Sequence, residues 1–442
     1  MRWARSLSAL GALGVTDGTG GLVVTGYCTA PTELGGARIV PSGGAAMVVA
    51  GFAPGDAAHL FSVSHGGTGS IFPFLHDVDT NGSPIVYGVS YGAVDLGQGA
   101  VAGGSPDGTT NPPADGYIGV YGTGAPGWVA RIVGPGEDKI VASTLGPNST
   151  VYGGGWFAGT PTFNGGTVSS SSVTDRNIFL ARFNVFTGVV DLTRTYGGPG
   201  LEEMSDAASI GNTLVATGHF DETTGLATPS SLEFGGTAHA LTSNGGHDIW
   251  VAKLDTQGNG VWATSFGSAG EDRDPRIAID AAGDVYVTGS FTGQVAFGAI
   301  NLVSQGGPDV FLAKLHGANG SVAWAVSFGS AAPTTAALND GAGGIAVDAA
   351  GHVVITGRLG GPIDGSSSAG GLDGFIASFE AATGALRWRK IISTTGDDSA
   401  GAVTFGRDGD VYAVAGLGGA FDFGVPLIGP AAPASVLLRI AP

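Results

Sequence analysis

Residues 248–291 read DIWVAKLDTQGNGVWATSFGSAGEDRDPRIAIDAAGDVYVTGSF, and this stretch decides the fold. It contains four short apolar runs, DIWVAKL, VWATSFG, RIAID and VYVTGSF, separated by segments rich in Gly, Asn and Asp. Within each run the apolar residues alternate, and β-branched and aromatic types are frequent, which favours strands. No ten-residue stretch combines helical periodicity with a cap. The sequence therefore predicts four strands joined by turns, with helix nearly absent.

The same pattern returns from Asp309 and from Asp373, and these three copies fix the register of weaker ones. The large apolar residue of the VWATSFG run recurs at seven positions, spaced 58 to 70 residues apart: Trp3, Phe61, Trp128, Leu192, Trp262, Trp324 and Trp388. The glycine that closes VYVTG recurs independently at Gly26, Gly88, Gly155, Gly218, Gly289 and Gly357, with Ala415 or Gly416 completing the set. The two markers agree on seven units.

Seven units of four short strands indicate radial repetition. We predict an all-β fold, a seven-bladed β-propeller with four-stranded antiparallel blades, forming a single domain over residues 1–442. The last unit has a third strand within residues 434–440 and no fourth strand after it. Residues 1–8 match the missing strand in register, so the N-terminal strand is expected to pair with the C-terminal blade and close the propeller.

The composition excludes several classes of protein. With 18 basic and 36 acidic residues, the net charge of −18 argues against nucleic acid as a partner. Gly, Asp or Ser interrupts every hydrophobic run, so no membrane insertion is expected. Cys28 is the single cysteine, which excludes an intramolecular disulfide and leaves the role of this residue open. We expect a monomer.

The repeat resembles that of the bacterial seven-bladed β-propeller repeat (SBBP-like) proteins, whose units carry a similar D-x-F-V-A-K-L, W-x-x-x-x-G, I-A-V-D-x-x-G-N-V-Y-V-T-G pattern. The match is good over 248–291, 309–357 and 373–416 and loose elsewhere. The resemblance implies a propeller fold and an extracellular or cell-envelope location. It supplies no catalytic residue, because most members of the family have no assigned activity.

The connections between second and third strands are long, whereas the hairpin turns on the other face are short, and long loops on a rigid scaffold are common binding sites. The sequence carries no enzyme motif in a suitable context, and the eight histidines are scattered, so we identify no catalytic residue. We therefore expect a non-catalytic binding or display scaffold with a protein or carbohydrate ligand on the long-loop face. Two alternatives stay open: a polysaccharide-active hydrolase or lyase with acidic residues at the channel mouth, and a calcium-rigidified structural module of a longer surface protein.

Acidic residues recur in the linkers that precede the innermost strands. Five of the seven units carry one at the equivalent position: Asp138, Glu202, Asp272, Asp340 and Asp398. Radial symmetry would gather them at one mouth of the channel, where carboxylates could hold Ca²⁺. In the alternative interpretation, each accepts hydrogen bonds from its own turn.

The tryptophans of the repeat have a fixed place in their units, which favours packing between blades over sugar binding. Trp156 departs from the repeat, since it follows the closing glycine Gly155. We expect it to be an exposed aromatic residue and a candidate ligand contact.

Overall fold

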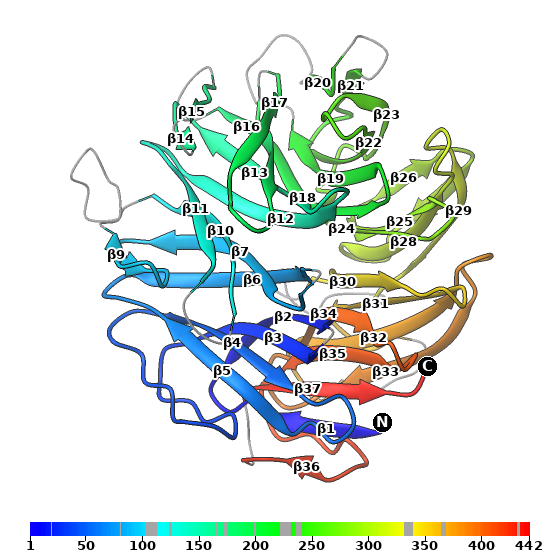
Figure 1. Cartoon of the computed structure of the whole chain (residues 1–442). Helices are drawn as coiled ribbons and strands as arrows, with labels where there is room; N and C mark the ends of the chain where they lie inside the picture. Colours follow the sequence, from blue (N-terminus) through cyan, green and yellow to red (C-terminus); the bar gives the residue numbers. More distant parts are fainter. Residues whose placement is uncertain are drawn as a thin grey trace. The chain divides into compact units, whose positions relative to one another are not determined.

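A computed structural model describes the chain except for residues 19, 80, 102–112, 123–125, 164–165, 171–174, 199, 222–230, 236–239, 331–338, 364–367 and 431–433. The fold is the predicted seven-bladed β-propeller (Figure 1). The described residues contain strands, turns and bends but no helix, and hence none that is long and apolar enough to cross a membrane.

Six blades are antiparallel sheets with four main strands that run in chain order from the innermost to the outermost. The sheet of blade 2 continues beyond its outermost strand into β14 (Thr162–Phe163) and β15 (Gly166–Thr167). Blade 1 consists of β2 (Gly11–Gly18), β3 (Gly21–Cys28), β4 (Ala46–Phe52) and β5 (His59–His65). Blade 2 consists of β6 (Ser70–Val78), β7 (Pro84–Tyr91), β10 (Asp115–Val120) and β11 (Trp128–Val133). Blade 3 consists of β12 (Asp138–Gly146), β13 (Thr150–Ala158), β16 (Arg176–Asn184) and β17 (Val190–Tyr196). Blade 4 consists of β18 (Glu202–Ile210), β19 (Thr213–Asp221), β22 (His247–Leu254) and β23 (Gly260–Phe266). Blade 5 consists of β24 (Arg273–Ile279), β25 (Val285–Phe291), β28 (Asp309–Leu315) and β29 (Val322–Phe328). Blade 6 consists of β30 (Gly341–Val347), β31 (His352–Leu359), β32 (Asp373–Glu380) and β33 (Leu386–Ile392).

Blade 7 joins the two ends of the chain, as predicted. Its sheet contains β34 (Ser399–Phe405), β35 (Val411–Gly416), β37 (Ser435–Ile440), β1 (Trp3–Ser6) and β36 (Leu427–Ile428), in that order. Strand β1 runs antiparallel to β37, with Trp3 opposite Arg439 and Ser6 opposite Val436. The N-terminal residues are therefore strand residues of the last blade.

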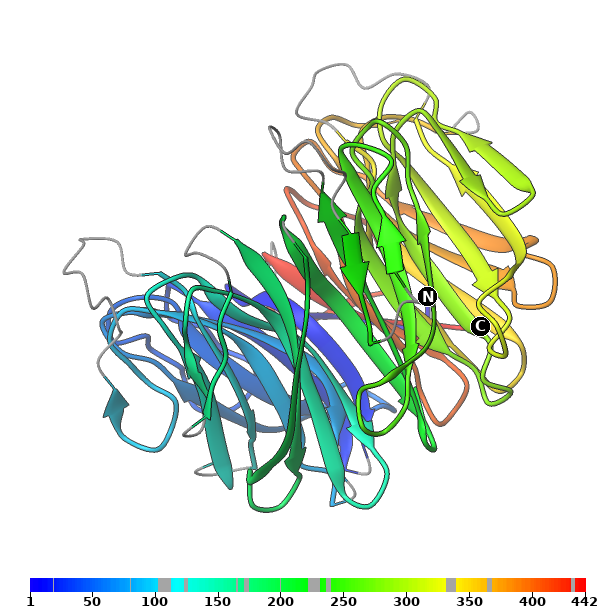
Figure 2. The ribbon, with the colours of Figure 1, turned by 90° about the horizontal axis from the view of Figure 1, so that it is seen from above.

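Short hairpins extend from several blades: β8 (Val94–Asp95) with β9 (Ala100–Val101), β14 (Thr162–Phe163) with β15 (Gly166–Thr167), β20 (Ser231–Glu233) with β21 (Ala240–Thr242), and β26 (Gln294–Phe297) with β27 (Ile300–Val303). The chain divides into two compact units. One unit comprises residues 1–195, 406–414 and 423–441, and the other comprises residues 196–405 with 415–422 and 442. The twist of the individual sheets in both units is visible in Figure 2.

The recurring closing glycine is explained by a bulge in the innermost strand. Strands β12 and β18 shift register at Ile140/Ala142 and at Met204/Asp206. Just before each bulge, a backbone carbonyl lies against the closing glycine of the second strand. A Cβ on Gly155 would collide with the carbonyl of Lys139, and one on Gly218 with the carbonyl of Glu203. Only a residue without a side chain fits there.

Tryptophans of the outermost strands connect successive blades. Four of them donate the indole N–H to a backbone carbonyl of the following blade: Trp3 to Pro54 (3.1 Å), Trp128 to Val185 (2.7 Å), Trp262 to Gly317 (3.1 Å) and Trp324 to Ala381 (3.1 Å). Beside three of these rings lies a glycine with positive φ. Gly188, for example, has φ 68°, and a Cβ there would be 2.6 Å from the ring of Trp128. The packing between blades predicted for the tryptophans is confirmed.

Candidate functional site

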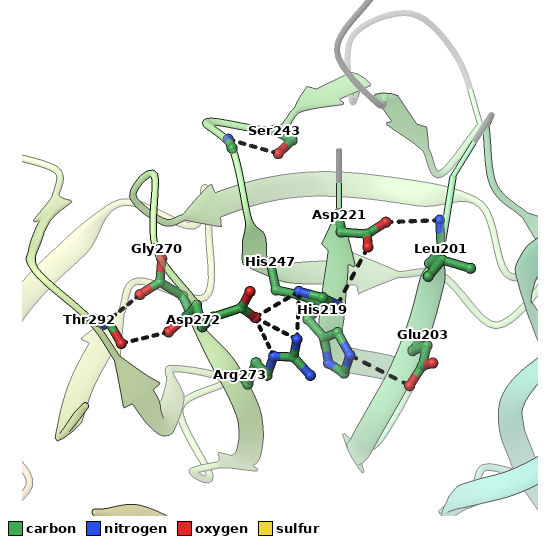
Figure 3. A network of polar contacts seen from close by, with 12 residues as sticks. Leu201, Glu203, His219, Asp221, Ser243, His247, Gly270, Asp272, Arg273 and Thr292 are labelled. Carbon is green, nitrogen blue, oxygen red and sulfur yellow. Dashed lines mark hydrogen bonds and ion pairs between the residues drawn. The ribbon is translucent and has the colours of Figure 1, made fainter. Parts of the chain in front are cut away.

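Six polar side chains of blades 4 and 5 form one network, which we call the histidine site (Figure 3). Its members are Glu203, His219, Asp221, His247, Glu271 and Arg273. They lie where β18, β22 and β24 begin and where β19 ends, which is the face of the long second-to-third connections. All six belong to the unit that contains residues 196–405.

Strand register explains why four of these side chains meet. Glu203 on β18 is the cross-strand partner of His219 on β19, and Asp221 is the partner of His247 on β22. Because His219 and Asp221 are two residues apart on one strand, they project from the same face of the sheet. The repeat architecture therefore brings together residues that are up to 44 positions apart in the sequence.

The two imidazoles are the centre of the network. Their ring centroids are 5.2 Å apart. His219 Nε2 lies 3.5 Å from Glu203 Oε2, and His247 Nε2 lies 3.6 Å from Asp221 Oδ2. Each histidine thus has a carboxylate of its own.

Glu271 and Arg273 contact the outward side of His247. His247 Nδ1 is 2.9 Å from Glu271 Oε2 and 2.9 Å from Arg273 Nη2. When His247 is protonated, Nδ1–H can donate to Glu271, and when it is neutral, Nδ1 can accept from Arg273. The Nδ1 atom therefore has both an acceptor and a donor within hydrogen-bond distance.

The inner histidine is shielded and the outer ion pair is not. The His219 side chain is 12% exposed, whereas Glu271 and Arg273 are 55% and 43% exposed. Burial lowers the pKa of His219 below its ordinary value of 6.5, although the charge of Glu203 partly opposes this effect. Partial burial acts to raise the pKa of Glu271, but the hydrogen bond from Arg273 and the neighbouring His247 hold it below its ordinary value. The site therefore combines a buried histidine, His219, whose pKa is lowered, with an exposed ion pair between Glu271 and Arg273.

The sequence contains a signal for this site, although spacing alone did not predict it. We treated the eight histidines as scattered, and the structure corrects this interpretation for His219 and His247. His219 directly follows the closing glycine Gly218, and His247 directly precedes the repeat aspartate Asp248. Both are departures from the repeat consensus at positions that the strand register makes neighbours. Comparison of the repeats at these positions would have found the pair.

The five acidic linker positions lie where the sequence predicted, at the beginning of the innermost strands, and the four aspartates among them accept hydrogen bonds from backbone N–H groups of their own blades. Asp272 Oδ1 accepts from Thr292 N (3.0 Å) and Oδ2 accepts from Ser268 N (2.7 Å). Similar backbone hydrogen bonds are made by Asp138, Asp340 and Asp398. Glu202 occupies the equivalent position at the beginning of β18 and is buried. Among the residues that the structure describes, no three His, Cys, Asp or Glu side chains are placed to hold a metal ion. The turn interpretation accounts for these contacts, and the calcium site stays a prediction.

Burial of these carboxyl groups leads to a testable dependence on pH. Burial raises the pKa of Asp138 to about 8, whereas the same carboxyl in the unfolded chain has a pKa near 3.8. Between these pH values the folded chain therefore holds a proton that the unfolded chain has released. The contribution of this group to stability is therefore complete below pH 3.8 and is lost as the pH rises toward 8. Asp138→Asn, which cannot titrate, should lose less stability over this range than the wild type. Urea unfolding at pH 4, 6 and 8 measures the difference, and parallel curves for the two proteins would contradict it.

Trp156 is not the exposed residue that we predicted. It is 3% exposed, and its ring contacts two cations, with Lys139 Nζ 4.7 Å and Arg176 Cζ 4.2 Å from the ring centroid. Arg176 also contacts Glu137, at 3.2 Å. The expectation of exposure is wrong because these long side chains cover the ring. Ligand contact at Trp156 stays a prediction that would require one of them to move.

Comparison with known proteins identifies no family. No family model matches the chain, and no curated protein matches it. The solved structures that align with it include the quinohemoprotein alcohol dehydrogenase of Comamonas testosteroni (12% identity over 99% of this chain and 76% of that chain, TM-score 0.41). They also include the Pan2 WD40 domain of Neurospora crassa (10% identity over 99% of this chain and 90% of that chain, TM-score 0.45). A third is a europium-containing methanol dehydrogenase (12% identity over 93% of this chain and 84% of that chain, TM-score 0.40). At these values the likeness assigns no activity.

These matches nevertheless correct one prediction. We expected a non-catalytic scaffold, but two of the similar structures are dehydrogenases, which are enzymes. The assignment as a non-catalytic binding or display scaffold is withdrawn. The structure supports the propeller fold that the resemblance to the SBBP-like repeat implies.

Proposed function

We propose that the protein is an enzyme that hydrolyses small esters by general acid–base catalysis at the histidine site. The observation that carries the proposal is the pair of imidazoles with centroids 5.2 Å apart, each next to a different carboxylate. Paired groups in different environments can take opposite roles in proton transfer. Here both histidine side chains are shielded, at 12% and 16% exposure, but only His247 also contacts Glu271 and Arg273.

In the proposed reaction His219 is the base, because burial keeps it neutral. It accepts a proton from water as the water oxygen bonds to the ester carbonyl carbon. Protonated His247 then donates a proton to the leaving alkoxide as the ester C–O bond breaks, so the products are an acid and an alcohol. Asp221 contacts Nε2 of His247 and Glu271 contacts Nδ1, so the two carboxylates orient the ring for this transfer.

The charge of the site indicates the class of ester. Carboxylates of Glu203, Asp221, Glu271 and Asp274 surround the pair, and Arg273 supplies the opposing charge. Negative charge repels anionic substrates and attracts cationic ones. The protein should therefore hydrolyse neutral and cationic esters in preference to anionic ones.

Hydrolysis of three probes tests the proposal: p-nitrophenyl butyrate (neutral), butyrylthiocholine (cationic) and p-nitrophenyl hemisuccinate (anionic). We expect the first two to react at least about tenfold faster than the third, as expected for electrostatic steering. The His219→Gln/His247→Gln double variant should lose this activity. His316→Gln is the matched control, since His316 is exposed and lies outside the network. Equal rates for the double variant and the wild type would refute the proposal.

A further inference from the structure

In three blades, the connection between the second and third strands places one phenylalanine over the blade. In blade 5, Phe297 of hairpin β26–β27 has its ring centroid 4.7 Å from that of Phe266 and 4.8 Å from that of Phe311. The corresponding residue of blade 4 is Phe234, which packs on Tyr196 and Trp250 at 5.2 and 4.9 Å. In blade 3 it is Phe163, which packs on Phe179 and Phe183 at 5.7 and 5.5 Å.

The blade 5 hairpin covers a specific apolar surface. Phe297 and Leu302 belong to one buried cluster with Ala313 and Leu315 of β28, and Ile300 packs on the same cluster. The cluster also includes Val322 and Ala325 of β29 at its periphery. The hairpin thus completes the outer part of its own blade.

Among the described residues of its second-to-third connection, 360–363 and 368–372, blade 6 has no strand that could form such a hairpin. Its connection, residues 360–372, is shorter than residues 292–308 of blade 5 and contains no aromatic residue. Ile363 reaches the core of the blade, but a pocket of about 230 Å³ stays open beside it. This blade 6 pocket is lined by Val326 and Phe328 of β29, Ala377 and Phe379 of β32, and Leu386 and Arg389 of β33.

The repeat register shows that the pocket is the place of the missing hairpin. Ala377, Phe379, Leu386 and Arg389 occupy the positions that Ala313, Leu315, Val322 and Ala325 occupy in blade 5. Those four blade 5 residues belong to, or pack against, the same apolar cluster as Phe297 and Leu302 of the hairpin. Leu386 is consequently 50% exposed.

The strand beside the pocket is unusually basic for this chain. β33 has the sequence LRWRKII and carries Arg387, Arg389 and Lys390, in a protein whose net charge is −18. Arg387 pairs with Glu380 of its own blade, with Nε 2.9 Å from Oε1, so the proposal rests on Arg389 and Lys390. It is also the outermost strand of its sheet, so one backbone edge faces away from the blade. The positive charge of β33 favours an acidic partner. The backbone edge of the same strand favours a partner in an extended conformation, which could pair with it.

We propose that the blade 6 pocket binds an acidic extended segment of a partner protein, which inserts one aromatic side chain. The aromatic ring takes the place that Phe297 takes in blade 5, and flanking carboxylates contact Arg389 and Lys390. The binding site is separate from the histidine site and does not depend on its function.

A peptide based on the chain's own hairpin tests the proposal. The probe carries residues 294–303, QVAFGAINLV, with Gln294→Glu and Asn301→Glu, two positions that are exposed in blade 5. Fluorescence anisotropy of the labelled probe should detect saturable binding. Phe297→Ala in the peptide, or Gln294→Lys with Asn301→Lys, should weaken it at least about tenfold.

Variants of the full chain locate the binding. Arg389→Glu and Leu386→Glu should each reduce affinity about tenfold, as for interface anchors. Arg407→Glu makes the same charge change at an exposed arginine elsewhere and should leave affinity unchanged. Circular dichroism confirms that each variant is folded.

Three results would overturn the proposal. The first is a failure of the acidic peptide to bind at millimolar concentration, or equal binding of its Phe297→Ala form. The second is binding of phenylacetate as tightly as the peptide, which would indicate a small-molecule pocket. The third is self-association of the chain that Leu386→Glu abolishes, which would assign the pocket to a second copy.

Discussion

Trp128→Ala should destabilise the protein by about 3–5 kcal/mol, the usual cost of truncating a buried tryptophan. Trp128 is 6% exposed, stacks on Phe183 at 5.6 Å, and donates its indole N–H to the Val185 carbonyl. The substitution removes all of these contacts between blades 2 and 3. The shift of the urea unfolding midpoint, followed by far-UV circular dichroism, measures the loss.

Phenylalanine variants separate the hydrogen bond from the packing. Trp128→Phe keeps an aromatic ring but leaves the Val185 carbonyl without its indole donor, which should cost about 1–3 kcal/mol. Trp388→Phe is the matched control, because the Trp388 indole N–H has no partner among the described residues. If both phenylalanine variants lose equal stability, the indole hydrogen bond contributes nothing and the expected difference is wrong.

His219→Gln should reduce kcat/KM for p-nitrophenyl butyrate about 10²–10⁴-fold, the range that general-base catalysis contributes. The wild-type rate should rise with pH through an acid limb below pH 6.5, because only neutral His219 accepts a proton and burial lowers its pKa below that value. The pH–rate profile and kcat/KM of both proteins test this expectation.

Glu203→Gln distinguishes catalysis from a structural role of His219. The charge of Glu203 raises the pKa of His219, so its removal should move the acid limb to lower pH. A variant that only altered the fold would change the rate at all pH values without moving the limb. An unmoved limb would therefore contradict the role of His219 as base.

The fold was predictable from the sequence because its determinants repeat. The apolar alternation, the marker tryptophans and the closing glycines each recur at a fixed place in the unit, and the bulge before Gly155 and Gly218 gives the glycine its physical reason. The pairing of β1 with β37 followed from the count of strands. These features depend on local pattern and on topology, which a sequence displays directly.

The histidine site was not predictable in the same way, because it consists of departures from the pattern. His219 and His247 become neighbours only through the pairing of β18, β19 and β22. The exposure of Trp156 also could not be derived, since it depends on where the side chains of Lys139 and Arg176 lie. Contacts of this kind are decided by rotamers and charges that no spacing rule encodes.

The direction of the tryptophan contacts has a consequence for synthesis on the ribosome. Each indole donates to a blade that is translated later: Trp128 needs Val185, and Trp324 needs Ala381. Strand β1 is made long before β37, with which it pairs. In a nascent chain β1 therefore stays unpaired until residues 435–440 have been made, and each of these tryptophans lacks its acceptor until the next blade has been made. The early blades are natural substrates for chaperones during that interval.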